Sequence, residues 1–191
     1  SCTYAEEIQN FANWFSYYRK RGLAMKAAIS QFVADTSDRV AYTAINNSAS
    51  TAINISILEM NDSATSGNGR TLLKGVFSTV PYSGGTPRLR YGLDAVGRYF
   101  ECTTGNAFVF AASSPGSVYC PIQSAASGGG CQQNFAVMVT GNAWSLSDDF
   151  NTSAYAVGNT DYTAASGYDG GNYADLSNDV SNTLADIAMH Y

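Results

Sequence analysis

The sequence predicts an α/β fold: a three-layer sandwich with helices on both faces of a mostly parallel central sheet and one antiparallel hairpin at its edge. Segments with helical periodicity alternate with short β-rich segments along the 191 residues. The run 134–140, Asn-Phe-Ala-Val-Met-Val-Thr, is continuously apolar, which is typical of a parallel strand covered on both faces. Segments 39–45 and 53–58 are separated by a short polar loop and predict the hairpin. A chain of this length can bury one core, so we expect a single domain over residues 1–191.

Four helical segments are expected. In 5–35 apolar residues recur at spacings of three and four, which predicts one long amphipathic helix or two helices broken near Gly22. A short helix is expected at 71–80, and another from Pro87 to Phe100. The last is expected from about Tyr173 to Met189.

Thr86 is the first candidate site residue. In Ser83-Gly84-Gly85-Thr86-Pro87 the glycines predict a turn, Thr86 an N-cap and Pro87 the first helical position. The helix start would then offer a hydroxyl beside unpaired N–H groups, where an anion or a metal-bound water can bind. A well-capped helix without a ligand explains the same residues.

A second candidate is the exit of the predicted central strand. Open α/β sheets bind ligands beyond the carboxyl ends of their strands, so Gly141, Asn142 and Trp144 are expected to line a crevice.

Composition limits the possible functions. Only 13% of residues are charged and the net charge is −5, so no positive field is available to hold a nucleic acid. No apolar run reaches 18 residues, so no membrane span is expected. His190 is the only histidine, and neither a G-x-S-x-G motif nor a P-loop occurs, so we expect no enzyme.

The four cysteines lack the spacing of a metal site. Cys2, Cys102, Cys120 and Cys131 instead predict two disulfides in an oxidising compartment, with three pairings open. The Gly- and Ser-rich stretch 102–131 is expected to be a disulfide-tethered insertion, and 145–171 a polar loop. The start at Ser1, without Met or signal peptide, suggests a processed or excised segment.

Four blocks of the sequence, in the right order, resemble the PilC/PilY family of type IV pilus tip-associated proteins. The blocks are Gln9–Arg19 with Leu23–Ile29, Gly85-Thr86-Pro87 with Leu93–Phe100, Cys131–Phe135 with Thr140 and Trp144, and Thr183–Met189. The resemblance implies a von Willebrand factor A-type domain, forming the N-terminal part of a larger pilus adhesin and assembly factor.

The resemblance also implies a metal site, of which this chain matches one part. Such domains hold a divalent metal by an Asp-x-Ser-x-Ser motif, a Thr in a second loop and an Asp after the central strand. Thr86 matches the second element, but Gly141 stands where the family has Asp, and no Asp-x-Ser-x-Ser motif occurs. Either the first strand lies upstream of Ser1 or the site has decayed, so we expect no cofactor from these residues alone. Mg²⁺ or Ca²⁺ would require upstream residues to complete the site.

The function implied is a non-enzymatic, extracellular adhesion or assembly domain at the pilus tip (fimbrium), with a place in pilus assembly and twitching motility. Its expected partners are pilus subunits (minor pilins) and a host or abiotic surface. The alternative is a structural, pilin-like filament subunit. That alternative predicts an antiparallel sheet and an apolar helix face continuing upstream of Ser1.

Overall fold

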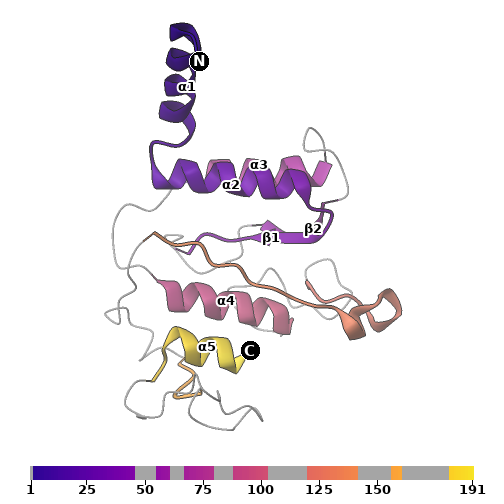
Figure 1. The fold of residues 1–191 in the computed structure, drawn as a ribbon. Helices are drawn as coiled ribbons and strands as arrows, with labels where there is room; N and C mark the ends of the chain where they lie inside the picture. The colour runs from indigo at the N-terminus through magenta and orange to yellow at the C-terminus, as the bar shows by residue number, and fades with distance from the viewer. Residues whose placement is uncertain are drawn as a thin grey trace. The chain divides into compact units, whose positions relative to one another are not determined.

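The structure, a computed structural model, describes residues 2–45, 55–60, 67–79, 88–102, 120–141, 156–160 and 181–191 (Figure 1). The helices are α1 (Tyr4–Tyr17), α2 (Arg21–Asp35), α3 (Gly67–Ser78), α4 (Leu89–Glu101) and α5 (Leu184–His190), and the strands are β1 (Arg39–Tyr42) and β2 (Ile55–Glu59). Two short 3-10 turns, η1 (Ala125–Ser127) and η2 (Gly129–Cys131), follow Cys120.

Residue contacts divide the chain into two compact units. Unit 1 comprises Ser1–Val40, Leu58–Pro81 and Val139–Gly141; unit 2 comprises Ala41–Ile57, Tyr82–Met138 and Asn142–Tyr191. The single domain expected over 1–191 stays a prediction.

In unit 1, the predicted helical segment 5–35 forms two helices. A capping box starts α1, because Thr3 N–H donates to Glu6 Oε2 at 2.6 Å and Glu6 N–H donates to Thr3 Oγ1 at 3.4 Å. The chain turns at 18–20 and α2 begins at Arg21, so the break precedes Gly22. α2 packs against α3, with Val33, Leu72 and Val76 buried.

The strands β1 and β2 pair as an antiparallel hairpin, as predicted. β1 ends at Tyr42, three residues before the predicted end, and β2 ends at Glu59, one residue after it. Met60 N–H donates to Asp38 O at 3.0 Å just beyond them. Among the described residues this is the only sheet, and it has two strands. The parallel sheet of the three-layer sandwich therefore stays a prediction.

The structure does not form the strand predicted at 134–140. A covered central strand requires neighbours on both faces, whereas the side chains of Phe135, Val137 and Val139 are 78%, 87% and 55% exposed. The apolar run is present, but its described surroundings do not cover it.

In unit 2, α4 is the most buried helix described. Leu89, Tyr91, Ala95 and Tyr99 are buried along it, and α5 packs against it through Ile187. α4 begins at Leu89 with Arg88 as its N-cap, two residues later than predicted; Thr86 and Pro87 lie outside the described residues.

α5 begins at Leu184 rather than near Tyr173. Asn182 adopts a left-handed conformation (φ 61°), and Thr183 with Asp186 forms a capping box. Residues 161–180 lie outside the described residues, but 181–183 are not helical, so a continuous helix from Tyr173 is wrong.

Two disulfides were expected and the structure forms one, between Cys102 and Cys120. The predicted insertion 102–131 would require Cys102 to pair with Cys131. In the structure Cys102 pairs with Cys120 instead, so the disulfide closes the shorter segment 102–120. Cys2 and Cys131 are exposed free thiols.

Candidate functional site

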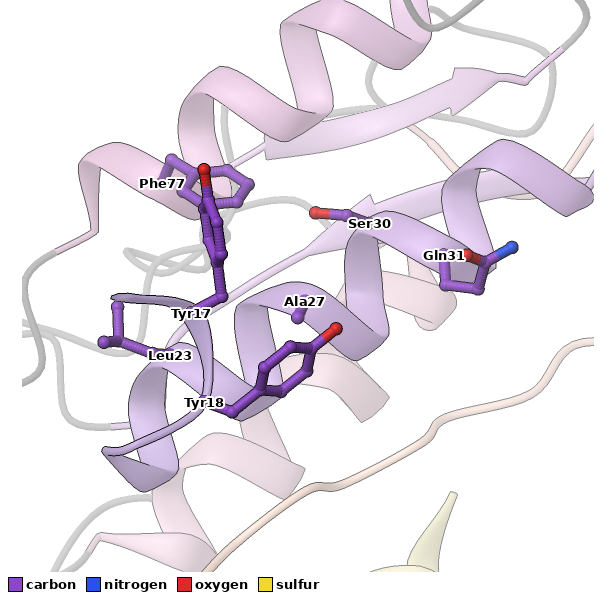
Figure 2. A pocket seen from close by; sticks show the side chains of 7 residues that line it. All are labelled: Tyr17, Tyr18, Leu23, Ala27, Ser30, Gln31 and Phe77. Atoms are coloured by element: carbon purple, nitrogen blue, oxygen red, sulfur yellow. The ribbon is translucent and has the colours of Figure 1, made fainter. Parts of the chain in front are cut away.

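A surface pocket lies at the corner where α1 meets α2. Its volume is about 310 Å³, and Figure 2 shows the seven side chains that line it: Tyr17, Tyr18, Leu23, Ala27, Ser30, Gln31 and Phe77. Tyr17 and Tyr18 come from the end of α1, Phe77 comes from α3, and the other four come from α2. Apolar walls with a few polar tips suit a partly apolar side chain of a partner.

A second hollow of about 490 Å³ shares Leu23 with this pocket and is rimmed by basic residues. Four of the ten Lys and Arg residues of the chain lie between positions 19 and 26: Arg19, Lys20, Arg21 and Lys26. In a chain of net charge −5 this corner is a local source of positive potential.

Each basic residue of the corner has a different environment. Arg19 places its guanidinium 4.0 Å from the centroid of the Phe15 ring. Arg21 Nη1 donates to Gly141 O at 2.8 Å. Lys26 is buried and its Nζ donates to Phe77 O and Thr79 O, both at 2.9 Å, which satisfies carbonyls at the end of α3. Arg19 and Lys20 are both exposed, so their charges face solvent.

The helix leading into the corner and its C-cap residue carry an apolar stripe, defined as Tyr4, Ile8, Phe11 and Phe15 of α1 with the C-cap Tyr18. Its members are spaced by four, three, four and three residues, and each is exposed. α1 has no buried residue. Phe11 stacks on Phe15 with ring centroids 6.1 Å apart, and Trp14 contacts Phe11 from the flank of the stripe.

This corner is not among the site residues predicted from the sequence. A signal is present in the sequence, because four aromatic residues within 14–18 are followed directly by the basic residues 19–21. The apolar periodicity of 5–35 predicts only an amphipathic helix and does not by itself indicate a binding site.

Of the residues predicted for the metal site and the crevice, Gly141 is described and the others are not. Gly141 is exposed, and its carbonyl accepts the Arg21 guanidinium. Thr86, Asn142 and Trp144 lie outside the described residues, so the crevice stays a prediction.

As far as the described residues reach, the surroundings of Gly141 do not fit a divalent cation. The position offers no carboxylate, and the guanidinium bound to its carbonyl would repel a cation. Within the described ranges, no group of three or more His, Cys, Asp or Glu residues could hold a metal.

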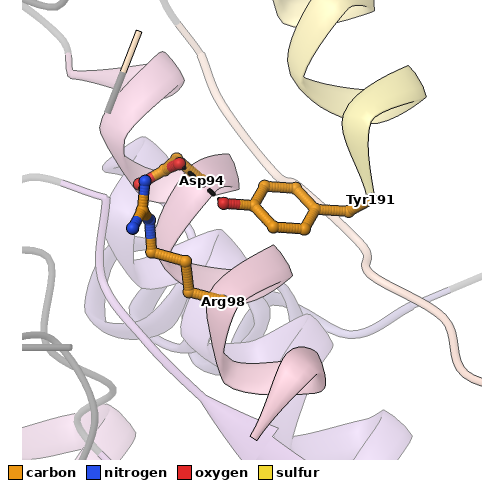
Figure 3. Close-up of polar contacts among 3 residues, drawn as sticks. All are labelled: Asp94, Arg98 and Tyr191. Atoms are coloured by element: carbon orange, nitrogen blue, oxygen red, sulfur yellow. Dashed lines mark hydrogen bonds and ion pairs between the residues drawn. The ribbon is translucent and has the colours of Figure 1, made fainter. Parts of the chain in front are cut away.

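A polar cluster of Asp94, Arg98 and Tyr191 in unit 2 stabilises the fold (Figure 3). Asp94 is 1% exposed and accepts hydrogen bonds from Arg98 Nε and Tyr191 Oη, both at 2.9 Å. Burial, followed by the hydrogen bond to Asp94, raises the pKa of the Tyr191 hydroxyl well above its ordinary value. Tyr191 therefore stays a proton donor and fixes the end of the chain to α4.

A second polar network holds segment 156–160 against α5. Asp186 is fully buried and accepts from Thr160 N–H at 2.6 Å and from Thr183 N–H at 2.8 Å. Asn182 and Gly158 exchange two hydrogen bonds of 2.8 Å. These hydrogen bonds give partners to the buried Asp186 carboxylate and to the backbone groups around it, because polar groups inside a fold need hydrogen-bond partners.

The chain is similar to proteins of type IV pilus biogenesis. It is 30% identical over 196 residues to the type IV pilus biogenesis factor PilY1 of Pseudomonas aeruginosa strain PAK, covering 98% of this chain and 15% of that protein. It is 28% identical over 203 residues to PilY1 of Pseudomonas aeruginosa strain PAO1, covering 97% of this chain and 16% of that protein.

These similarities support a relation to the PilC/PilY family, and the chain spans about one sixth of the curated relatives it matches. No family model matches the chain, and no solved structure matches it significantly. In the part of the chain that the structure describes, every helix is too short or too polar to cross a bilayer.

Proposed function

We propose that this chain is an extracellular domain of a type IV pilus-associated protein and that it acts through contacts with other proteins or surfaces, without catalysis. The similarity to PilY1 over nearly the whole chain supports the pilus association. The Cys102–Cys120 disulfide supports an oxidising compartment outside the cytoplasm. The observation that carries the proposal is the corner of α1 and α2, where an apolar pocket lies beside exposed basic residues.

This corner would take part in pilus assembly by binding pilus subunits, the minor pilins, at the pilus tip. The pocket can receive an aromatic or aliphatic side chain of the partner, which is the usual form of an interface anchor. Arg19 and Lys20 favour an acidic segment beside that anchor, because complementary charges steer association and fix its orientation. Adhesion to a host or abiotic surface and a role in twitching motility are further parts of this proposal.

The test uses the full-length protein in its pilus-forming host. Lys20→Glu reverses an exposed charge of the corner, and Ala27→Leu adds methyl groups to the pocket. We expect each to reduce surface pili and the twitching zone severalfold at unchanged levels of the protein. Lys74→Glu reverses an exposed charge on α3 in the same unit and should leave both unchanged. Normal piliation after deletion of residues 1–191 would reject the proposal.

A filament subunit is the second candidate, and one observation favours it. The exposed apolar stripe of α1 resembles the helix face that such a subunit packs into a filament core. Copy number separates the two candidates. Quantitative immunoblotting of sheared pili should find far fewer copies than of the major pilin if the chain acts at the tip, and comparable amounts if it is a filament subunit.

A further inference from the structure

The apolar stripe of α1 is an exposed apolar surface of unit 1, and only its last member, Tyr18, lines the pocket. Tyr4 is 82% exposed and Phe11 is 61% exposed, while soluble proteins seldom leave contiguous aromatic surface uncovered. The spacing of four, three, four and three residues is the seven-residue repeat by which helices pair in coiled coils. We propose that two copies of this chain associate through α1, with the two helices antiparallel and their apolar stripes facing each other.

The stripe is complementary to itself in the antiparallel orientation. When Phe11 of one copy lies opposite Phe15 of the second, Ile8 of one copy lies opposite Tyr18 of the second. Two-fold symmetry repeats both contacts, so four pairs of apolar side chains meet in one interface. Phe11 and Phe15 stack on each other and Arg19 lies over the Phe15 ring, yet the two residues are still 61% and 45% exposed, which leaves surface of both for the second copy.

The charges at the two ends of α1 are complementary between two copies, and they favour the antiparallel orientation over the parallel one. α1 is acidic in its first turn, with Glu6 and Glu7, and is followed by the basic Arg19 and Lys20. Antiparallel helices bring the acidic end of each copy beside the basic end of the other. Parallel helices would place like charges together, which is unfavourable.

The first experiment measures the mass of the 191-residue chain in solution, with Cys2→Ser and Cys131→Ser to prevent intermolecular disulfides. We expect a concentration-dependent dimer, with a mass approaching twice 20.2 kDa. Phe15→Glu should shift the chain to monomer, whereas Asn13→Glu on the opposite face of α1 should not. Both variants should stay folded because α1 has no buried residue, and circular dichroism checks this.

The second experiment tests the orientation by cross-linking. Ala12 flanks the stripe, so the two Ala12 residues meet near the two-fold axis of the antiparallel pair and lie on opposite flanks in a parallel pair. In the same cysteine-free background, Ala12→Cys should form an intermolecular disulfide on mild oxidation, and Asn13→Cys should not. Phe15→Glu should abolish the cross-link.

Three results would overturn the proposal. The first is a parent chain that stays monomeric, and the second is a dimer insensitive to Phe15→Glu or not cross-linked through Ala12→Cys. The third is a monomer that binds phosphatidylglycerol vesicles through Phe15, which would assign the stripe to a lipid surface. Because these measurements need no pilus protein, they can fail while the proposed pilus function holds, and the reverse.

Discussion

Asp94 illustrates how unit 2 keeps a carboxylate away from water. Its Oδ2 accepts a hydrogen bond from Arg98 Nε, and its Oδ1 accepts one from the Tyr191 hydroxyl. The buried carboxylate therefore has one cationic and one neutral donor. Leaving such a group without a partner costs more than the hydrogen bond itself contributes. The sequence could not predict this contact, because Asp94 and Tyr191 are 97 positions apart.

Tyr191→Phe removes one of the two donors to Asp94. We expect the free energy of unfolding to fall by about 1–3 kcal/mol, measured by urea denaturation at pH 7. Tyr4→Phe removes a hydroxyl from a residue that is 82% exposed and should have almost no effect. Equal effects of the two substitutions would contradict the role given to Tyr191.

The difference between parent and Tyr191→Phe should depend on pH. The folded state raises the pKa of Tyr191 above its ordinary value of 10, so the stabilisation is fully present below pH 10. It should decline above pH 10, where the unfolded chain releases the proton and the folded chain retains it. Urea denaturation at pH 8 and pH 10.5 checks the sign, and a difference that grows with pH would contradict it.

Two glycines of α4 offer a matched test of packing. A Cβ at Gly97 would clash with the ring of Tyr191, whereas a Cβ at Gly92 would make ordinary contact with Ile45 at 3.4 Å. Gly97→Ala should therefore destabilise the fold by about 1–3 kcal/mol. Gly92→Ala should be neutral or stabilising by up to about 1 kcal/mol, because alanine favours the helix. Thermal unfolding of both variants distinguishes these outcomes.

At the scale of elements, local sequence signals predicted the presence of helices better than their ends. Apolar periodicity indicated helices in 5–35, 71–80 and 87–100, and the structure has helices in all three. The capping boxes that start α1 at Thr3 and α5 at Thr183 have sequence signatures, an acidic residue three positions after each threonine. Apolar spacing cannot show where a helix ends. The spacing of three and four residues continues through 18–20, where the backbone turns between α1 and α2.

The strand predicted at 134–140 failed for a different physical reason. A continuous apolar run indicates burial, but burial depends on neighbouring segments that the local sequence does not specify. In the structure Phe135 and Val137 are exposed and do not belong to the sheet formed by β1 and β2. The crevice predicted at Gly141, Asn142 and Trp144 was placed at the end of that strand. Without the strand, the sequence no longer indicates a crevice at these residues.

The start of α1 should respond to acid. The hydrogen bonds from Thr3 to the Glu6 carboxylate lower the pKa of Glu6 below its ordinary value of 4.5. The capping box is therefore complete above pH 4.5 and should be lost as the pH falls through the lowered pKa. We expect helical circular dichroism to decrease in that range.

Glu6→Gln is the control for this titration. Gln can still accept a hydrogen bond from the N-cap backbone but does not titrate, so its helical signal should lack the Glu6 contribution. An identical acid transition in both proteins would contradict the role of Glu6.

At the scale of the whole molecule, the division into two units lies beyond what the sequence could predict. Each unit combines segments that are far apart in the chain: unit 1 takes in 1–40, 58–81 and 139–141. Such a division depends on long-range contacts, of which Arg21 with Gly141 is one example. The apolar and turn patterns of the sequence report only on the nearest neighbours along the chain.

The disulfide should stabilise unit 2 specifically. Cys102 and Cys120 are buried and close a loop with a sequence separation of 18, which restricts the unfolded chain. We expect the double substitution Cys102→Ala with Cys120→Ala to lower the free energy of unfolding by about 3 kcal/mol. Cys2→Ser with Cys131→Ser changes two exposed free thiols and should leave stability unchanged. Denaturation followed by the near-ultraviolet signal of the tyrosines compares the two proteins, and mass spectrometry of the peptides confirms the pairing. Equal stabilities of the two double variants, or peptides that link Cys2 or Cys131 to Cys102, would show that the cysteines pair differently.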